Sequence, residues 1–125
     1  MRRRMLEYAF AAALVGCGSG EPGALAPIEA VIAAARDDDP SGLSDLCDPE
    51  GHADSDARRL CAAHPENARD WALFRAWLGD ARILGIGSAT DEPDELHVAV
   101  AIGPDHRRVE VTVVRRGERW YLLRL

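Results

Sequence analysis

The amino-acid sequence predicts an α+β fold in which N-terminal helices pack on a four-stranded antiparallel meander sheet. Up to Gly79 the apolar residues recur with a period near 3.6, as in amphipathic helices, and beyond Gly79 they alternate with a period of two, as in strands. Only short turns separate the alternating segments, which favours antiparallel neighbours. Because the helices precede the strands, we expect a single domain over residues 24–125 with its helices on one face of the sheet.

The first predicted helix runs from Leu25 to Arg36, where the apolar residues form one stripe. Pro27 lies near its first turn, where the missing N–H costs little. The segment Asp37–Pro40 should end the helix, because the residue before a proline avoids the α region. Ser41 is then the expected N-cap of a short second helix. Its apolar residues would be Leu43, Leu46 and Cys47.

A polar loop from Asp48 to Asp56 follows, and Asp54 or Ser55 can cap the third helix. That helix would carry Ala57, Leu60, Cys61 and Ala62. A fourth helix is expected from Glu66 to Leu78, with Gly79 at its C-terminus. Its apolar stripe consists of Trp71, Phe74, Trp77 and Leu78.

Four strands are predicted after Gly79. The first, over residues 82–88, is weakened by Gly85 and Gly87, whereas those over residues 95–102 and 107–115 alternate clearly. The fourth, over residues 119–125, should place Trp120 and Leu122 on one face. The opposite face would carry Tyr121, Leu123 and Leu125. Turns at residues 103–105 and 116–118 join the last three strands.

The first sixteen residues have the pattern of an export signal. Arg2, Arg3 and Arg4 precede an apolar run from Tyr8 to Val15, which is shorter than the about 20 residues that a membrane span needs. A charged start, a short apolar stretch and small residues before a cleavage point are typical of a signal peptide. An ordinary soluble N-terminus with a buried cysteine is the alternative, and Glu7 favours it.

The segment Leu14-Val15-Gly16-Cys17 resembles the lipobox of bacterial lipoproteins. The resemblance implies that residues 1–16 are cleaved off, that Cys17 is lipidated, and that residues 17–23 form a flexible linker. The implied location is the bacterial cell envelope, with the protein anchored in a membrane through lipid. Gly18, where an aspartate would favour the inner membrane, favours the periplasmic face of the outer membrane.

Composition excludes one class of partner. The 125 residues include 15 basic and 21 acidic ones, and the formal net charge is −6. Loss of the arginine-rich first segment would make the remaining chain more acidic, so a nucleic-acid partner is not expected. A domain of this size buries a modest core and gains from a covalent cross-link.

The order of elements from Ala24 to Leu125 resembles the nuclear transport factor 2-like superfamily of cystatin-like cone folds. The matching features are the helix that ends in Asp37-Asp38-Asp39, the short helix with Leu43 and Leu46, and the final hairpin over residues 116–122. The resemblance implies a cone-like sheet whose interior, in the enzymes of the superfamily, holds an acid or base. The helical segment between Asp54 and Leu78 is longer than that pattern.

Cys47 and Cys61 are the candidates for a disulfide, because they lie 14 residues apart on predicted apolar helix faces in an exported chain. Two buried thiols are one alternative. A zinc site is another, since His52 and His64 would add two imidazoles to the two sulfurs. The spacing of these four residues does not match a familiar zinc motif.

The acidic loop and the strand histidines give no catalytic or metal motif. Alternating carboxylates suit calcium, but an EF-hand that began at Asp48 would need glycine and glutamate where Ala53 and Arg59 stand. We therefore expect a solvated loop and helix caps from these acids: Asp48, Glu50, Asp54 and Asp56. His97 and His106 are expected to be surface or packing residues.

The sequence predicts a binding or structural role rather than catalysis. No nucleophile–base set, phosphate loop or cofactor motif is present, so a non-enzymatic protein without a cofactor is expected. Expected partners are the membrane, an envelope protein or an apolar small molecule. An aromatic stripe usually belongs to the core, but four aromatics could line a pocket: Trp71, Phe74, Trp77 and Trp120. The alternatives are an exported cone-fold enzyme with a pocket acid and a metal-binding module.

Overall fold

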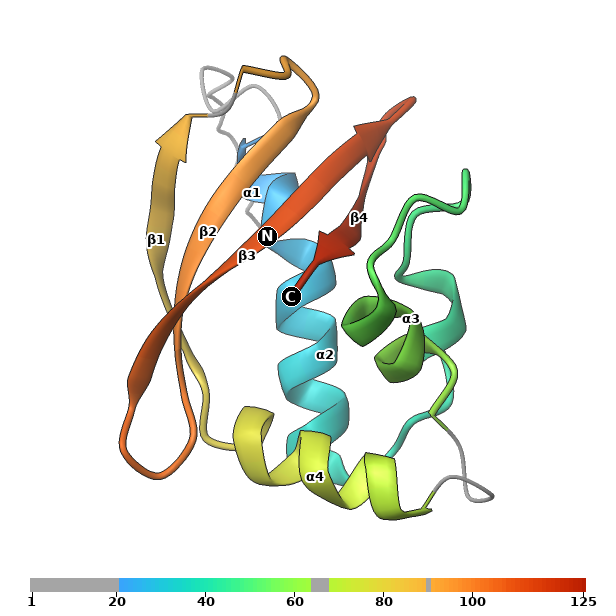
Figure 1. Cartoon of the computed structure of the whole chain (residues 1–125), viewed down its shortest axis with the longest axis vertical. Coiled ribbons are helices and arrows are strands. Elements are labelled where there is room, and N and C mark those ends of the chain that lie inside the picture. Colours follow the sequence, from blue (N-terminus) through green and yellow to red (C-terminus); the bar gives the residue numbers. More distant parts are fainter. Residues whose placement is uncertain (1–20, 64–67, 90) are drawn as a thin grey trace, which may run out of the picture.

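The computed structural model describes residues 21–63, 68–89 and 91–125, so the predicted signal peptide and Cys17 lie outside the described residues. The chain folds into helices followed by one sheet, which confirms the predicted α+β class (Figure 1). The helical elements are α1 (Glu21–Ala24), α2 (Ala26–Asp37), the 3-10 turn η2 (Leu43–Asp45), α3 (Ser55–Cys61) and α4 (Ala68–Leu78). The strands are β1 (Arg82–Ala89), β2 (Glu95–Ile102), β3 (Arg107–Arg116) and β4 (Arg119–Arg124).

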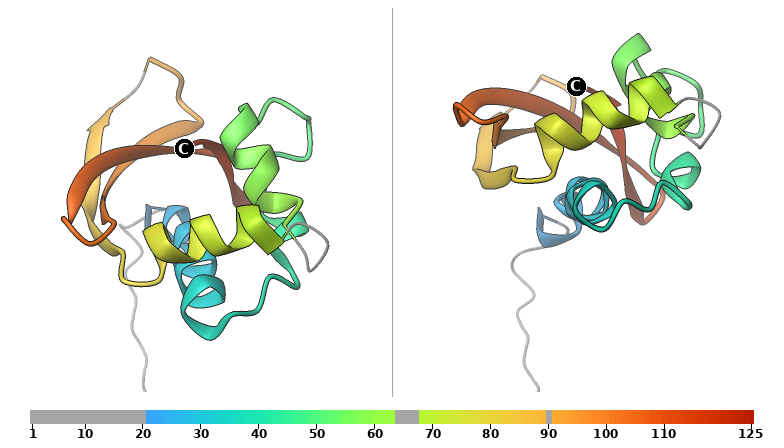
Figure 2. Two further views of the ribbon diagram at one scale, coloured as in Figure 1. Left: turned by 60° about the horizontal axis from the view of Figure 1, so that its bottom comes forward. Right: turned by 90° about the horizontal axis from the view of Figure 1, so that it is seen from below.

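The sheet is the predicted antiparallel meander, with strands in the order β1-β2-β3-β4. Pairing between β2 and β3 is unbroken from Glu95↔Val114 to Ile102↔Arg107. The sheet arches over α2, which is seen end-on in Figure 2, and α4 crosses near one end of α2. No helix among the described residues is long and apolar enough to cross a bilayer.

Helix α2 lies under the sheet because its apolar stripe is continuous. Ile28, Val31, Ile32 and Ala35 are all buried, as expected for residues that recur on one face of a helix. The helix ends at the predicted place, where Asp38 adopts a left-handed conformation and its N–H bonds to Ala34 O. Below it, Arg75 Nε of α4 donates to Ala35 O at 3.0 Å, which ties the two helices together.

The structure begins with a short helix, α1, where a linker was predicted. Residues Glu21–Ala24 form α1, although the linker was expected to reach Gly23. Ala24 is fully buried, and a side-chain carbon at Gly23 would lie 3.5 Å from Cδ1 of Trp120. Burial against the core therefore orders residues whose composition alone favours a linker.

The short second helix is a single 3-10 turn. Ser41 does not cap it, because its Oγ and backbone N–H both donate to Asp39 Oδ1, at 2.6 and 3.1 Å. Gly42 occupies the N-cap position instead, at φ +93°, which glycine adopts without strain. Cys47 lies beyond the turn, in a parallel bridge with Leu122, so the prediction that it lies on a helix face is wrong.

A β-bulge in β4 changes the face on which the chain ends. Thr112 pairs with Arg124 while Val113 pairs with Leu122, so Leu123 is an extra residue in the ladder. An extra residue reverses the alternation beyond it. The prediction that Leu125 lies on the face opposite to Leu122 is therefore wrong, and both side chains face the helices.

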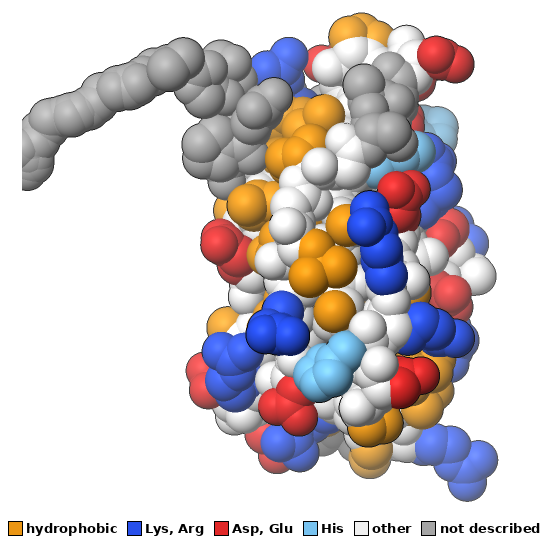
Figure 3. Space-filling model, turned by 90° about the vertical axis from the view of Figure 1, so that its left-hand side faces the viewer, with side chains coloured by type: hydrophobic (Ala, Val, Ile, Leu, Met, Phe, Trp, Pro, Cys, Tyr) orange, Lys and Arg blue, Asp and Glu red, His pale blue; other side chains and the backbone are white. Residues whose placement is uncertain are grey.

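The outer edge of β4 is covered by the segment of residues 46–54. The backbone N–H of Leu122 donates to Leu46 O at 2.7 Å. The backbone N–H of Asp48 donates to Leu122 O at 3.0 Å, and that of Asp54 donates to Leu123 O at 2.8 Å. At the other edge of the sheet, β1 shows apolar side chains among charged ones (Figure 3). Leu84 and Ile86 of this strand are 52% and 40% exposed.

Candidate functional site

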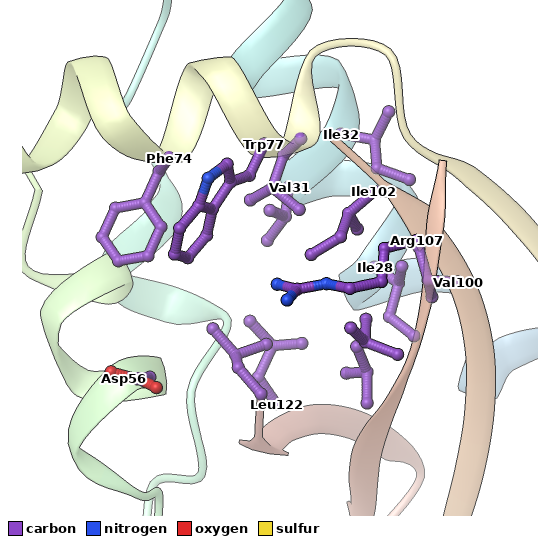
Figure 4. Close-up of a pocket in the computed structure, with 14 residues that line it drawn as sticks. Ile28, Val31, Ile32, Asp56, Phe74, Trp77, Val100, Ile102, Arg107 and Leu122 are labelled. Carbon is purple, nitrogen blue, oxygen red and sulfur yellow. The ribbon is translucent and has the colours of Figure 1, made fainter. Parts of the chain in front are cut away.

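An apolar cavity of about 290 Å³ lies between α2, α4 and the concave face of the sheet (Figure 4). Helix α2 contributes Ile28, Val31 and Ile32, and α4 contributes Phe74, Trp77 and Leu78. The strands contribute Val100, Ile102, Arg107, Val109, Val111, Leu122 and Leu125, and α3 contributes Asp56. Its volume is at the small end of the range for ligand pockets.

The alternation of the strands explains why the sheet wall is apolar. Every second residue of β2 faces the same side of the sheet, so Val100 and Ile102 lie on the concave face with buried Val98. On the paired strand β3, Val109 and Val111 lie beside them. The bulge in β4 adds the last side chain, Leu125, to this wall.

Two lining residues are charged. Asp56 of α3 is exposed, and one carboxylate oxygen lies 3.5 Å from Arg59 Nη1. Arg107 begins β3 with the inward parity of Val109, and its guanidinium extends into the space between Trp77 and Leu122 in Figure 4. Arg107 is exposed at the cavity, and within the described residues no carboxylate pairs with its guanidinium.

The mouth of the cavity is held by a contact between α4 and the turn that precedes Arg107. Gly103 N–H donates to Trp77 O at 3.0 Å, and His106 N–H closes the turn on Gly103 O at 3.1 Å. Both turn residues have positive φ, +76° for Gly103 and +52° for His106. The turn therefore sets Arg107 and Trp77 at the same end of the cavity.

Of the four predicted pocket aromatics, two line the cavity. Phe74 is 5% exposed and Trp77 is 41% exposed, so Trp77 stands at the opening. Trp71 is buried elsewhere, where its Nε1 donates to Asp38 Oδ1 at 2.8 Å. Trp120 is half-buried beside Gly23, away from the cavity. These two side chains serve the core, and only the C-terminal part of α4 faces the open space.

A disulfide joins Cys47 and Cys61, with 6.2 Å between their Cα atoms. It connects the segment after η2 to α3, instead of connecting two helices. The bond contradicts the zinc alternative, because metal binding requires thiolates. His52 uses its backbone N–H to bind Asp48 Oδ2, and His64 lies outside the described residues. Within the described part of the chain, no group of three potential metal-binding side chains converges.

The acidic loop contains one buried carboxylate. Asp54 caps α3 as predicted, accepting the Ala57 N–H at 2.8 Å. Asp48 was expected in a solvated loop, but its side chain has no exposed surface, and that expectation is wrong. Its oxygens accept hydrogen bonds from Arg116 Nε at 3.0 Å and Nη2 at 3.1 Å. These bonds lower the pKa of the Asp48 carboxyl below its usual value.

The strand histidines lie outside the cavity. His97 is on the opposite face of β2, where its Nδ1 is 3.4 Å from Glu110 Oε1 but is not aligned for a hydrogen bond. His106 is exposed in the turn before β3. Neither imidazole is placed to act on a molecule inside the cavity.

Arg107 is the charged cavity residue that the sequence analysis did not single out. Its parity with Val109 and Val111 on an alternating strand was a usable signal, since a charged residue in phase with inward-facing valines is exceptional. Comparisons with protein-family models, with curated proteins and with solved structures found no match to the chain.

Proposed function

We propose that this chain is a lipid-anchored protein of the bacterial cell envelope that binds an apolar small molecule without catalysing a reaction on it. The observation that carries the binding role is the cavity between α2, α4 and the sheet, whose lining is apolar apart from Arg107 and Asp56. Burial of apolar surface drives ligands into such sites, and a few polar groups orient them.

The exposure of Asp56 supports the proposal that the protein does not catalyse a reaction in the cavity. Among the described residues that line the cavity, Asp56 is the only carboxylate, and it is exposed and close to Arg59. A general acid or base is usually activated by burial or by a neighbour that moves its pKa toward neutrality. Asp56 is not buried.

The location in the envelope is supported by Leu14-Val15-Gly16-Cys17 and by the absence of aspartate after Cys17, which favours the outer membrane. The disulfide is consistent with an oxidising compartment. We also propose that the domain is a cone-like relative of the nuclear transport factor 2-like superfamily, and the arch of the sheet over α2 supports this assignment.

The anchor can be tested with a Cys17→Ser variant in the native host. The unchanged chain should partition with membranes and carry the mass of attached acyl chains, whereas the variant should lose both properties. Ser19→Ala is the matched control, and it should keep the membrane fraction and the added mass. An unmodified mass for the parent chain, or membrane partitioning of the variant, would contradict the anchor.

The binding role can be tested by titrating 1-decanol into the full-length Cys17→Ser chain, so that no acyl chain on the protein competes. Trp77 stands at the opening, and its fluorescence should change on binding. Val109→Phe should fill part of the cavity and weaken binding at least tenfold, whereas Leu84→Phe on exposed β1 should not. Equal binding by both folded variants would contradict a ligand in this cavity.

A further inference from the structure

The charge of Arg107 is the feature of the cavity that an apolar ligand alone does not explain. Arg107 is exposed, so its guanidinium stands where solvent reaches the cavity, and an anionic group that lies there can pair with it. Phe74, Val100 and Leu122, each at most 5% exposed, help form the apolar walls of the cavity. An uncharged headgroup would make no ionic contact with Arg107, whereas an oxyanion would form one.

Asp56, the other charged residue that lines the cavity, does not pair with Arg107. Arg59 lies 3.5 Å from Asp56 and 3.2 Å from Asp70, so the Asp56 carboxylate already has a cationic neighbour on its own helix. In Figure 4 Asp56 lies at the opposite side of the cavity from Arg107. The end of the cavity near Arg107 and Trp77 is therefore the positive end, although the chain as a whole is acidic.

We propose that the ligand is a single-chain amphiphile with an oxyanion headgroup, which pairs with Arg107 while its hydrocarbon chain enters the cavity. This inference rests on the proposed binding function and adds the chemical class of the ligand. Guanidinium groups pair with carboxylates and phosphates through two parallel hydrogen bonds, so either headgroup has the required chemistry.

The volume of the cavity sets the length of the hydrocarbon chain. Each water-sized group takes roughly 30 Å³ of a condensed phase. The cavity volume of about 290 Å³ therefore holds about ten such groups. A chain of about eight to ten carbons would fill the space, and further carbons would extend past Trp77 into solvent.

The experiment compares decanoate, decyl phosphate and 1-decanol, each below its aggregation concentration, by calorimetric titration into the full-length Cys17→Ser chain. At least one of the two anions should bind about 2- to 10-fold more tightly than the alcohol, because it gains a charge-assisted hydrogen bond to a guanidinium that solvent still reaches. The anion that binds more tightly, decanoate or decyl phosphate, identifies the headgroup. For the carboxylates, affinity should rise about fourfold per methylene from hexanoate to decanoate and then level off.

Arg107→Gln tests the assigned residue, and Arg108→Gln is its matched control. Replacing Arg108 makes the same change in net charge. Arg108 lies opposite Ala101 in the β2–β3 register, and its side chain is on the other face of the sheet from Arg107. Arg107→Gln should abolish the preference for the anion, so that the anion and 1-decanol bind that variant with similar affinity, whereas Arg108→Gln should keep the preference. High salt should reduce the preference in the parent chain.

Three outcomes would overturn the inference. If the alcohol binds as tightly as both anions, the ligand is not selected by charge, but the proposed binding function stands. If Arg108→Gln weakens anion binding as much as Arg107→Gln, the preference comes from net charge and not from the cavity. If none of the three ligands binds to the folded chain, the proposed function and the inference both fail.

Discussion

Replacing Asp48 with asparagine is expected to destabilise the fold by about 2–4 kcal/mol. The carboxylate is fully buried and accepts four hydrogen bonds, two from Arg116 and one each from the backbone N–H groups of Glu50 and His52. Breaking a fully buried pair costs about 3–5 kcal/mol. The Arg116 side chain is 28% exposed, so it regains some water, and asparagine keeps one acceptor oxygen. Both effects place the expected cost below the upper end of that range.

Urea denaturation of the Cys17→Ser chain measures this cost. With a slope of about 2 kcal/mol/M, typical of a small protein in urea, the midpoint should fall by about 1–2 M in Asp48→Asn. Asp45→Asn is the matched control, because Asp45 is exposed on η2 and its loss should change stability by less than about 0.5 kcal/mol. Equal midpoints for the two variants would refute the reasoning that the buried pair holds residues 46–54 against the sheet.

The same carboxylate predicts a dependence on pH. Hydrogen bonds from Arg116 hold the pKa of Asp48 below its usual value in the folded chain. Its contribution to stability is therefore fully present above the unfolded value of about 3.9 and is lost as the pH falls toward the folded value. The stability difference between parent and Asp48→Asn should be constant from pH 5 to 7 and should shrink below about pH 4. A difference that grows in acid would contradict the assignment.

Three further predictions concern other fixed points of the fold. Replacing Cys47 and Cys61 together by serine should cost about 3 kcal/mol, the loop-closure value for their separation of 14 residues; a reduced parent should show the same loss in urea. Asp54→Ala should cost about 1–2 kcal/mol through loss of the α3 cap, and Asp54→Ser should restore most of it. Trp71→Phe should cost about 1–2 kcal/mol by removing the bond to Asp38, measured as a lower melting temperature, while Asp38→Asn, which keeps an acceptor, should cost less.

Much of the fold could be predicted from the sequence because two periodicities decide it. The stripe of α2 and the alternation of β2 and β3 are local patterns, and β2 has the predicted bounds of Glu95–Ile102. The bulge at Leu123 could not be predicted, because a one-residue irregularity leaves no mark on an alternation that short. The helix α1 could not be predicted either, since it depends on burial of Ala24 against the folded core.

The candidate site was less predictable, because a cavity is defined by residues far apart in the chain. Phe74 and Trp77 of the aromatic stripe line the cavity, but the stripe did not indicate that Trp71 would face the end of α2. The buried state of Asp48 depends on Arg116, 68 residues later, and no local rule connects the two. Its local hydrogen bonds, by contrast, follow the turn chemistry expected of Asp-Pro-Glu-Gly.

The covering of β4 by residues 46–54 limits how such domains can join through their sheets. Growth of a fibre by edge-to-edge strand pairing requires two reactive edges on each unit. Among the described residues β1 pairs only with β2, while the outer edge of β4 already carries hydrogen bonds at Leu122 and Leu123. In the terms of polymer chemistry, the domain is a monomer with one reactive group, which is the outer edge of β1. Two units joined through β1 would keep only the covered edges of β4, which disfavours growth beyond a pair.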